Sequence, residues 1–302
     1  MKRLFALCLA LLLLLPGVPA LGEEPLDEIQ VLSSAFACLE EGNPFLTRYN
    51  TVTWAEVVPR LPQGVPYVWG GMTASHVFAK EPDYCVLPIS KGSPVWYEAG
   101  RKYINGFDCI GFIRYVYERA RRIKLTTISG LFAEKGLFLW SSRTEDTLPL
   151  RMQWTELDPG DLLVMEHPGR HIAMYVGTLR NYGYTEEELG ERLAAYIDYP
   201  LVIHSSVNAQ VSNRFADLIR NGLPKYKAAT DTDGGVCVSL ITPHRDSAPY
   251  TVNQQKQDTS YFVLPDGTWL TVLPYDEMTR FAWIRVPDGY EFPEPDPEPA
   301  NP

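Results

Sequence analysis

Three residues of the chain have side chains that together can carry out nucleophilic catalysis: Cys109, His171 and His204. Cys109 opens a stretch in which apolar residues recur every three or four positions, which predicts the first turn of an amphipathic helix. Unpaired backbone N–H groups and the helix dipole favour a thiolate there. A thiolate nucleophile needs a base, and the base needs a partner that orients it. His171 and His204, each in a predicted strand, meet both needs.

Each of these residues also has a purely structural interpretation. Free cysteine is among the most buried residue types, and a single Cys at a helix start commonly packs as a small apolar side chain. A single His in a strand is commonly a core residue whose hydrogen bonds are satisfied. The order of the surrounding motifs, rather than any one residue, favours the catalytic interpretation.

Five motifs follow one another along the chain: Gly64-Val-Pro-Tyr67-Val-Trp69-Gly70-Gly71, Phe107-Asp108-Cys109-Ile110-Gly111-Phe112, Leu157-Asp158-Pro159-Gly160-Asp161, His171-Ile-Ala-Met-Tyr175-Val-Gly177, and Ile203-His204-Ser205. In type and order they resemble the motifs of the NlpC family of bacterial cell-wall cysteine peptidases. The resemblance covers about residues 45–207, and a last strand is expected at residues 281–286.

The resemblance implies a papain-like α+β fold, in which the nucleophile helix packs on a central antiparallel β-sheet that carries both histidines. It implies that the Cys109 thiolate attacks a peptide carbonyl and that His171 takes the thiol proton and later protonates the leaving amine. His204 would then fix the tautomer of His171. The backbone N–H of Cys109 is the expected oxyanion donor. No metal or organic cofactor is implied.

The implied substrate is a peptidoglycan stem peptide or muropeptide, cut between a γ-D-glutamyl unit and a diamino acid. Tyr67 and Trp69 are expected to bind substrate. Tyr67 would lie near the nucleophile and hydrogen-bond the bound peptide, although aromatic packing explains this residue equally well. Asp108 resembles the family residue that holds the free amino end of the stem peptide, and it is also a good helix cap. Family members commonly have Ser directly after the Cys. This chain has Ile110 there, at a position that contributes to the D-glutamyl site.

Two other functions are consistent with the same motifs. An amidase or acyl-transferring relative would use the Cys/His pair on another amide or ester. A non-catalytic module would have kept the fold only to hold wall fragments, an interpretation that the presence of all three catalytic residue types disfavours.

The composition and the N-terminus predict an exported globular protein. The chain has 302 residues, of which 45% are hydrophobic, enough to bury the core of one large domain or two small ones. Residues 1–22 have the pattern of a secretory signal, with Lys2 and Arg3 before an apolar run. Their removal takes away two positive charges and changes the net charge from −10 to −12, which disfavours a nucleic-acid partner. We expect a secreted, cell-wall-associated protein without membrane insertion; its oligomeric state is left open.

Four cysteines follow the predicted signal: Cys38, Cys85, Cys109 and Cys237. If Cys109 is a free nucleophile, at most one disulfide forms among the other three. No pair has the Cys-x-x-Cys spacing of a metal site. Cys38 is predicted in the core, on the apolar face of a helix.

The organisation of the chain is predicted as follows. An N-terminal helix occupies residues 23–44, the papain-like domain residues 45–290, and a disordered Pro-rich acidic tail residues 291–302. Within the domain, residues 73–105 are expected to form an ordered loop insertion, and residues 178–200 a helical insertion capped by Thr185. Residues 209–280, a further insertion, contain a strand at 236–241 and a hairpin around Asp266-Gly267.

Local patterns predict several smaller elements. Thr53 and Glu56 form a capping-box pattern that predicts a short helix ending near Pro59. Strands at residues 162–166 and 172–176 form a predicted hairpin, so His167 and His171 do not share a helical face and form no zinc motif. A strand is predicted at 201–207, and residues 131–139 fit helix and strand equally well.

Overall fold

The structure is a computed structural model that describes residues 26–60, 106–142, 154–167, 169–206, 235–254 and 257–293. It also describes residues 65, 67, 71 and 72 and four short strands between residues 76 and 104. The predicted signal sequence and all but residues 291–293 of the predicted tail lie outside these residues.

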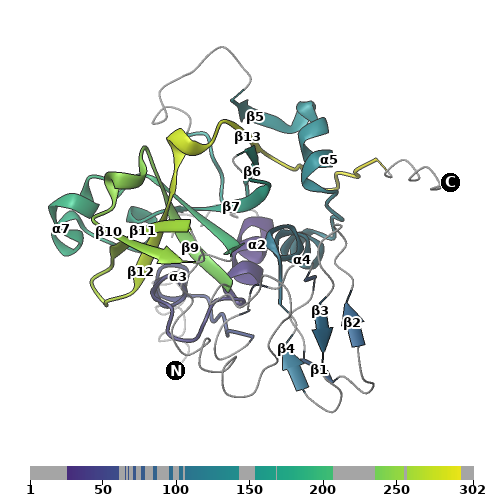
Figure 1. Cartoon of the computed structure of the whole chain (residues 1–302), viewed down its shortest axis with the longest axis horizontal. Helices are drawn as coiled ribbons and strands as arrows, with labels where there is room; N and C mark the ends of the chain where they lie inside the picture. The colour runs from purple at the N-terminus through teal and green to yellow at the C-terminus, as the bar shows by residue number, and fades with distance from the viewer. Residues whose placement is uncertain are drawn as a thin grey trace, which may run out of the picture.

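The described part of the chain is an α+β fold, as predicted, with few helices and a nine-stranded sheet (Figure 1). Its helices are α2 (Leu26–Phe36), α3 (Pro44–Thr53), α4 (Cys109–Arg121), α5 (Ile128–Ala133) and α7 (Glu186–Ala194). None of these helices is both long and apolar enough to cross a membrane. The helices α2 and α4 pack side by side and cover one face of the sheet.

The sheet has the strand order β10-β11-β12-β9-β8-β7-β6-β13-β5. The strands are β5 (Phe138–Ser141), β6 (Leu162–His167), β7 (His171–Thr178), β8 (Pro200–Ser206), β9 (Gly235–Thr242), β10 (Tyr250–Gln254), β11 (Gln257–Val263), β12 (Trp269–Pro274) and β13 (Arg280–Ile284). All neighbouring strands are antiparallel, as predicted for the central sheet, except β9 and β12, which are parallel. After β9 the chain crosses to the outer strand β10 and returns through β11, which brings β12 beside β9 in a parallel direction.

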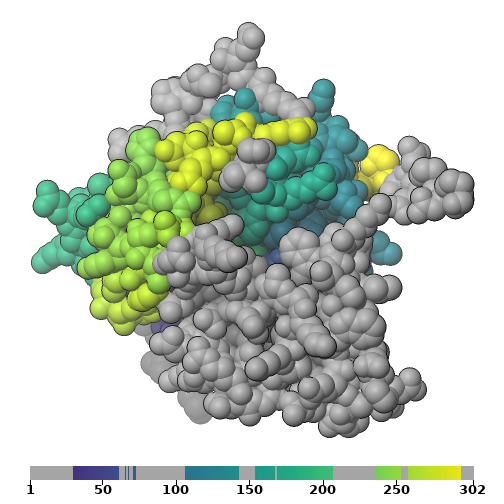
Figure 2. Space-filling model, in the orientation of Figure 1, coloured from purple at the N-terminus to yellow at the C-terminus, as the bar shows by residue number. Residues whose placement is uncertain are grey.

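Most predicted strands are confirmed. The hairpin β6–β7, the strand β8, the strand β9, the hairpin β11–β12 around Asp266-Gly267 and the last strand β13 all lie where the sequence patterns place them. Residues 131–139 contain the end of α5, a short 3₁₀ turn and the start of β5, so both of the interpretations left open apply in part. Strands β9 to β12 come from the predicted insertion at residues 209–280, and they extend the central sheet. Figure 2 shows these C-terminal strands, in green to yellow, along one side of the molecule.

One predicted helix is wrong. Thr53 ends α3 instead of starting a helix: its hydroxyl donates to the carbonyl of Tyr49, and Trp54 takes a left-handed conformation at φ 56°. The helix starts earlier because Asn43 accepts a hydrogen bond from the N–H of Phe45, and Pro44 occupies the first turn. The predicted N-terminal helix also ends earlier, at Phe36, while Cys38 beyond it is fully buried in the core, as predicted.

The predicted loop at residues 73–105 contains four short strands. β1 (His76–Phe78) pairs with β4 (Lys102–Ile104), and β2 (Tyr84–Val86) pairs with β3 (Val95–Tyr97), both antiparallel. The described parts of this segment are therefore nested hairpins rather than a loop. Figure 1 shows them together at one end of the molecule.

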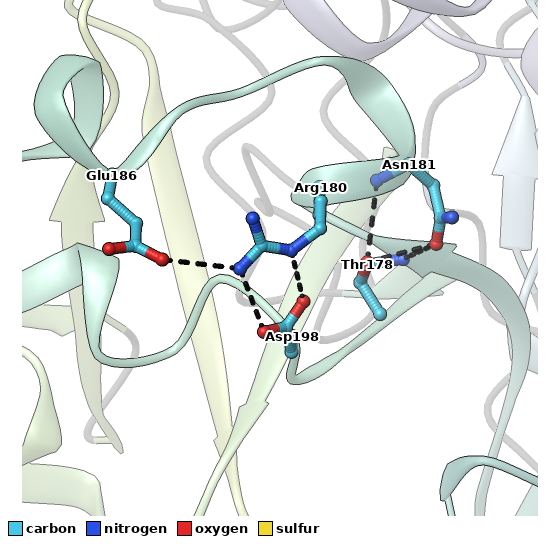
Figure 3. A network of polar contacts seen from close by, with 5 residues as sticks. All are labelled: Thr178, Arg180, Asn181, Glu186 and Asp198. Carbon is cyan, nitrogen blue, oxygen red and sulfur yellow. Dashed lines mark hydrogen bonds and ion pairs between the residues drawn. The ribbon is translucent and has the colours of Figure 1, made fainter.

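The helical insertion after β7 is closed by polar contacts. Thr185 caps α7 by accepting from the N–H of Glu188, as predicted. Before the helix, Arg180 reaches both carboxylate oxygens of Asp198, at 2.7 and 3.0 Å, and Glu186 at 3.3 Å (Figure 3). These exposed contacts join the two ends of the insertion, so that β8 starts beside the end of β7.

Alternation along the central strands separates two cores. In β7, Ile172, Met174 and Val176 face the core under the helices, whereas Ala173 and Tyr175 face a smaller cluster around Trp283 on the opposite side. In β8, Ile203 faces the helices and Val202 the smaller cluster. His171 lies an even number of residues from Tyr175 in β7, and His204 lies two residues after Val202 in β8. Both histidines are therefore on the sheet face of the smaller cluster, on adjacent strands.

Candidate active site

The start of α4 holds Cys109 at a fixed place. Asp108 precedes the helix in an extended conformation, and its carboxylate accepts from the N–H of Gly111 at 2.6 Å. The N–H of Asp108 donates to the carbonyl of Gly71 at 3.1 Å. The hydroxyl of Ser205, on β8 beside His204, donates to the carbonyl of Phe107 at 2.8 Å. The strand that carries His204 thus also anchors the residue that lies two positions before the nucleophile.

The helix start approaches the chain at residue 71 closely. A Cβ atom on Gly111 would lie 1.9 Å from the carbonyl oxygen of Gly71, well inside van der Waals contact. The sequence predicts a close backbone approach at Gly70-Gly71; the structure places it at Gly71, while Gly70 lies outside the described residues.

The two histidines are in direct contact. His171 Nε2 lies 2.7 Å from His204 Nδ1. Since Nε2 of His171 is engaged there, Nδ1 is the nitrogen left to exchange a proton with the nucleophile. The thiol of Cys109 is hydrogen-bonded by the backbone N–H of Ile172, the residue directly after His171. The structure therefore brings the Cys109 thiol to the start of β7, where His171 lies, and places His204 against Nε2 of the His171 ring.

Burial controls the protonation of the site. It raises the pKa of the Cys109 thiol to about 12, and the nearby Asp108 carboxylate adds to this, although the N–H groups of Ile172, Ile110 and Cys109 itself lower it. Burial also lowers the pKa of His171 to about 4 and that of His204 well below its ordinary value. The N–H groups of the helix start do favour a thiolate, as predicted, but desolvation of the buried thiol outweighs their effect.

His171 is neutral at neutral pH, because burial lowers its pKa. A neutral imidazole has a lone pair that can take a thiol proton as the sulfur attacks a carbonyl carbon. The first N–H groups of a helix have no partner within the helix, and those at the start of α4 that Asp108 does not cap can stabilise negative charge near Cys109.

The lowered histidine pKa values predict acid sensitivity of the fold. Between about pH 6.5 and pH 4 the unfolded chain binds protons that the folded chain excludes, so stability is full above pH 6.5 and falls as the pH drops. Each buried histidine contributes up to ~1.4 kcal/mol per pH unit in that window. Urea unfolding at several pH values, for the parent and for His204→Gln, measures this.

We expect a shallower pH dependence for His204→Gln than for the parent. His244→Ala is the control, because His244 is exposed and its bond to Asp276 raises its pKa instead. Identical curves for the parent and His204→Gln would contradict the assignment of acid sensitivity to the buried pair.

The predicted substrate-binding residues differ in how the structure places them. Tyr67 is buried beside the nucleophile: burial raises its pKa, and the negative charges of Cys109 and Asp108 raise it further. Asp108 caps α4, which is the structural role that the sequence also allows. Its carboxylate lies near enough to Cys109 and Tyr67 to raise the pKa of both side chains. Ile110 is half-buried and packs against the core under the helices. Trp69 lies outside the described residues.

The third motif is structural. Asp161 is buried at the start of β6, and Arg285, just after β13, donates to both of its carboxylate oxygens at 2.9 and 2.7 Å. The N–H of Asp158 donates to Asp161 as well, at 2.8 Å. These contacts hold the start of the β6–β7 hairpin in place, and His171 is the first residue of β7.

Sequence reasoning missed two groups around His204. Ser239 Oγ lies 2.8 Å from His204 Nε2, and Cys237 Sγ lies 3.5 Å from the same nitrogen. Both belong to β9, whose pairing with β8 is long-range, so no local pattern indicates them.

Cys38, Cys109 and Cys237 are free thiols. Within the described residues there is no group of three or more His, Cys, Asp or Glu side chains arranged to hold a metal.

A cysteine at a helix start and two histidines in contact, one of them at the start of a strand on which this helix packs, are the residue types expected of a thiol hydrolase on an α+β scaffold. The family model described as NlpC/P60 family matches residues 64–214, which is half of the chain, and the protein belongs to this family. This confirms the resemblance inferred from the five motifs. Members of the family are generally cysteine peptidases or amidases that act on peptidoglycan. Comparisons with curated proteins and with solved structures found no match.

Proposed function

We propose that this protein is an exported cysteine peptidase with a papain-like arrangement of its site, which cuts peptidoglycan stem peptides between the γ-D-glutamyl unit and the diamino acid. The observation that carries the proposal is the 2.7 Å contact between His171 Nε2 and His204 Nδ1, at the start of the strand beside Cys109. Family membership supports the wall substrate, and the signal-like residues 1–22 support export.

The mechanism that we propose has two half-reactions. The Cys109 sulfur attacks the scissile carbonyl while its proton passes to Nδ1 of His171, and the N–H of Cys109 stabilises the oxyanion. The tetrahedral intermediate collapses when the C–N bond breaks and His171 protonates the amine, which leaves a thioester on Cys109. A water molecule then gives a proton to His171 and attacks the thioester, releasing the carboxylate product and the thiol.

Mass spectrometry of purified muropeptides after incubation with the mature protein tests this function. We expect two products, of which one gains a γ-D-glutamyl carboxylate and the other a free amine on the diamino acid. Cleavage at a different amide would favour the amidase alternative. Transfer of the acyl group to an added amine would favour an acyltransferase, and binding without turnover a non-catalytic module.

The Ile110 position predicts altered specificity. An apolar side chain in place of Ser removes a hydroxyl from the D-glutamyl site, and sites that lose a hydrogen-bonding group lose discrimination. We expect the parent to prefer stem peptides with a free alanine amine over N-acylated ones only weakly. Ile110→Ser should raise the preference for the free amine roughly 10-fold. Competition kinetics with the two peptides measures the ratio.

Asp108 is expected to keep some preference for the free amine, since an ammonium–carboxylate contact in a closed cleft exceeds the ~0–1 kcal/mol of an exposed pair. A strong parental preference that Ile110→Ser leaves unchanged would contradict the prediction. It would show that Ile110 acts only through its contacts with the core.

A further inference from the structure

A chain of hydrogen bonds continues from His204 away from Cys109. Beyond the 2.8 Å contact between His204 Nε2 and Ser239 Oγ, Ser239 Oγ lies 2.6 Å from Thr271 Oγ1. Ser239 belongs to β9 and Thr271 to β12, the two strands that follow β8 in the sheet. Ser239 is fully buried and His204 is 2% exposed. Both hydroxyls lie outside residues 64–214, so the family match assigns them no role.

The chemistry at His171 fixes the direction of these bonds. When His171 has accepted the thiol proton, it carries an N–H on both ring nitrogens. Its Nε2–H then donates to His204 Nδ1, which must be unprotonated. Neutral His204 therefore carries its own proton on Nε2, and this N–H points at Ser239. A buried N–H without an acceptor is costly, so the charged state of His171 depends on an acceptor at this place.

Ser239 is the better of two acceptors for this N–H. The sulfur of Cys237 lies 3.5 Å from His204 Nε2, and a thiol sulfur accepts weakly. Ser239 can accept from His204 while its own hydroxyl donates to Thr271. Thr271 lines a pocket of about 160 Å³ together with His204 and Ser239, which has room for water to accept from the Thr271 hydroxyl. All donors then run in one direction, from His171 to the pocket.

We propose that Ser239 is a positioning residue of the site: it accepts from His204 Nε2 and so holds the tautomer of His204 that a charged His171 requires, with Thr271 orienting its hydroxyl. This inference rests on the proposed function, in which His171 is the base. Ser239 contacts His204 and not the substrate. Its loss should therefore lower the rate of the chemical step, measured as kcat, and leave substrate binding unchanged.

The kinetic test compares two buried serines of the same sheet. Ser239→Ala is expected to lower kcat roughly 10-fold with KM nearly unchanged, because a buried N–H loses its acceptor in the charged state. Adding Cys237→Ala should lower kcat further, because it removes the second acceptor. The control is Ser260→Ala on β11: Ser260 is 2% exposed and its hydroxyl lies 3.1 Å from that of Thr251, but two strands separate it from β8. It should lose similar stability and keep parental kcat.

A spectroscopic test does not depend on the folding of Ser239→Ala or on activity. Imidazole ¹⁵N NMR of the parent protein, with the His204 signals assigned by their loss in His204→Gln, should show the His204 proton on Nε2. A proton on Nδ1 in the parent would overturn the proposal, as would equal kcat values for Ser239→Ala and Ser260→Ala. Failure of the proposed function has a different signature: the parent would not cleave muropeptides, whatever the tautomer of His204.

Discussion

Replacing Cys109 by alanine is expected to abolish cleavage of stem peptides, with a loss of at least about a thousand-fold, while the protein remains folded. The sulfur is the atom that forms the acyl intermediate, and the other residues of the site cannot replace it. The structural cost is small, since the substitution removes only one sulfur atom at a helix start, together with its hydrogen bonds from backbone N–H groups such as that of Ile172. Muropeptide mass spectrometry and thermal unfolding of the same preparations measure both effects.

Cys38→Ala is the matched control, because it removes a fully buried thiol whose sulfur contacts the carbonyl of Ser34, outside the site. It should cost about 1 kcal/mol of stability and leave turnover unchanged. Cys109→Ala should still bind muropeptides, since the binding groups are intact. Cleavage by Cys109→Ala at the parental rate would end the cysteine-peptidase interpretation.

How much of the site was predictable depends on the range of the contacts. The pairing of His171 with His204 follows from the order of the motifs, although the 21 residues between β7 and β8 mean that the two strands do not form a simple hairpin. The contact of His204 with Ser239 was not predictable. Its register depends on β8 and β9 pairing across a long segment, and an alternating strand pattern at residues 236–241 does not identify the neighbouring strand.

Local signals fail where two of them compete. At the second helix, Asn43-Pro44 and Thr53-Trp-Ala-Glu56 can each start a helix, and the predicted helix rests on the second alone. The structure uses the first, because ten residues from Pro44 bury Phe45, Leu46 and Tyr49 against the core, whereas Trp54 is 94% exposed. Tertiary packing decides between capping signals of similar strength.

Local electrostatics show the same limit. The sequence places Cys109 at a helix N-terminus, which favours a thiolate, and the structure confirms the N–H groups there. The depth of burial, which raises the pKa of the thiol, arises from chain segments far apart in sequence. A helix-end effect of up to about 2 kcal/mol is outweighed by desolvation of a buried group.

Gly111→Ala is expected to inactivate the protein by displacing the nucleophile. Alanine inside an exposed helix is normally favoured over glycine by about 1 kcal/mol, so helix propensity alone predicts stabilisation. Here the added Cβ would lie 1.9 Å from the carbonyl oxygen of Gly71 and 3.0 Å from the Asp108 carboxylate. The first neighbour is backbone, held by the N–H of Asp108, and cannot rotate away.

The helix start must therefore shift away from residue 71. We expect a loss of about 1–3 kcal/mol in the free energy of unfolding, and a fall in kcat on the order of 100-fold, because a shift of about 1 Å misplaces the sulfur from His171. Gly136→Ala is the control: a Cβ there meets nothing within 4 Å, so stability should change by less than about 0.5 kcal/mol. Urea unfolding and muropeptide cleavage of both variants decide the matter. A Gly111→Ala protein that is more stable than the parent and fully active would show that propensity prevails and that the close approach at Gly71 does not position Cys109.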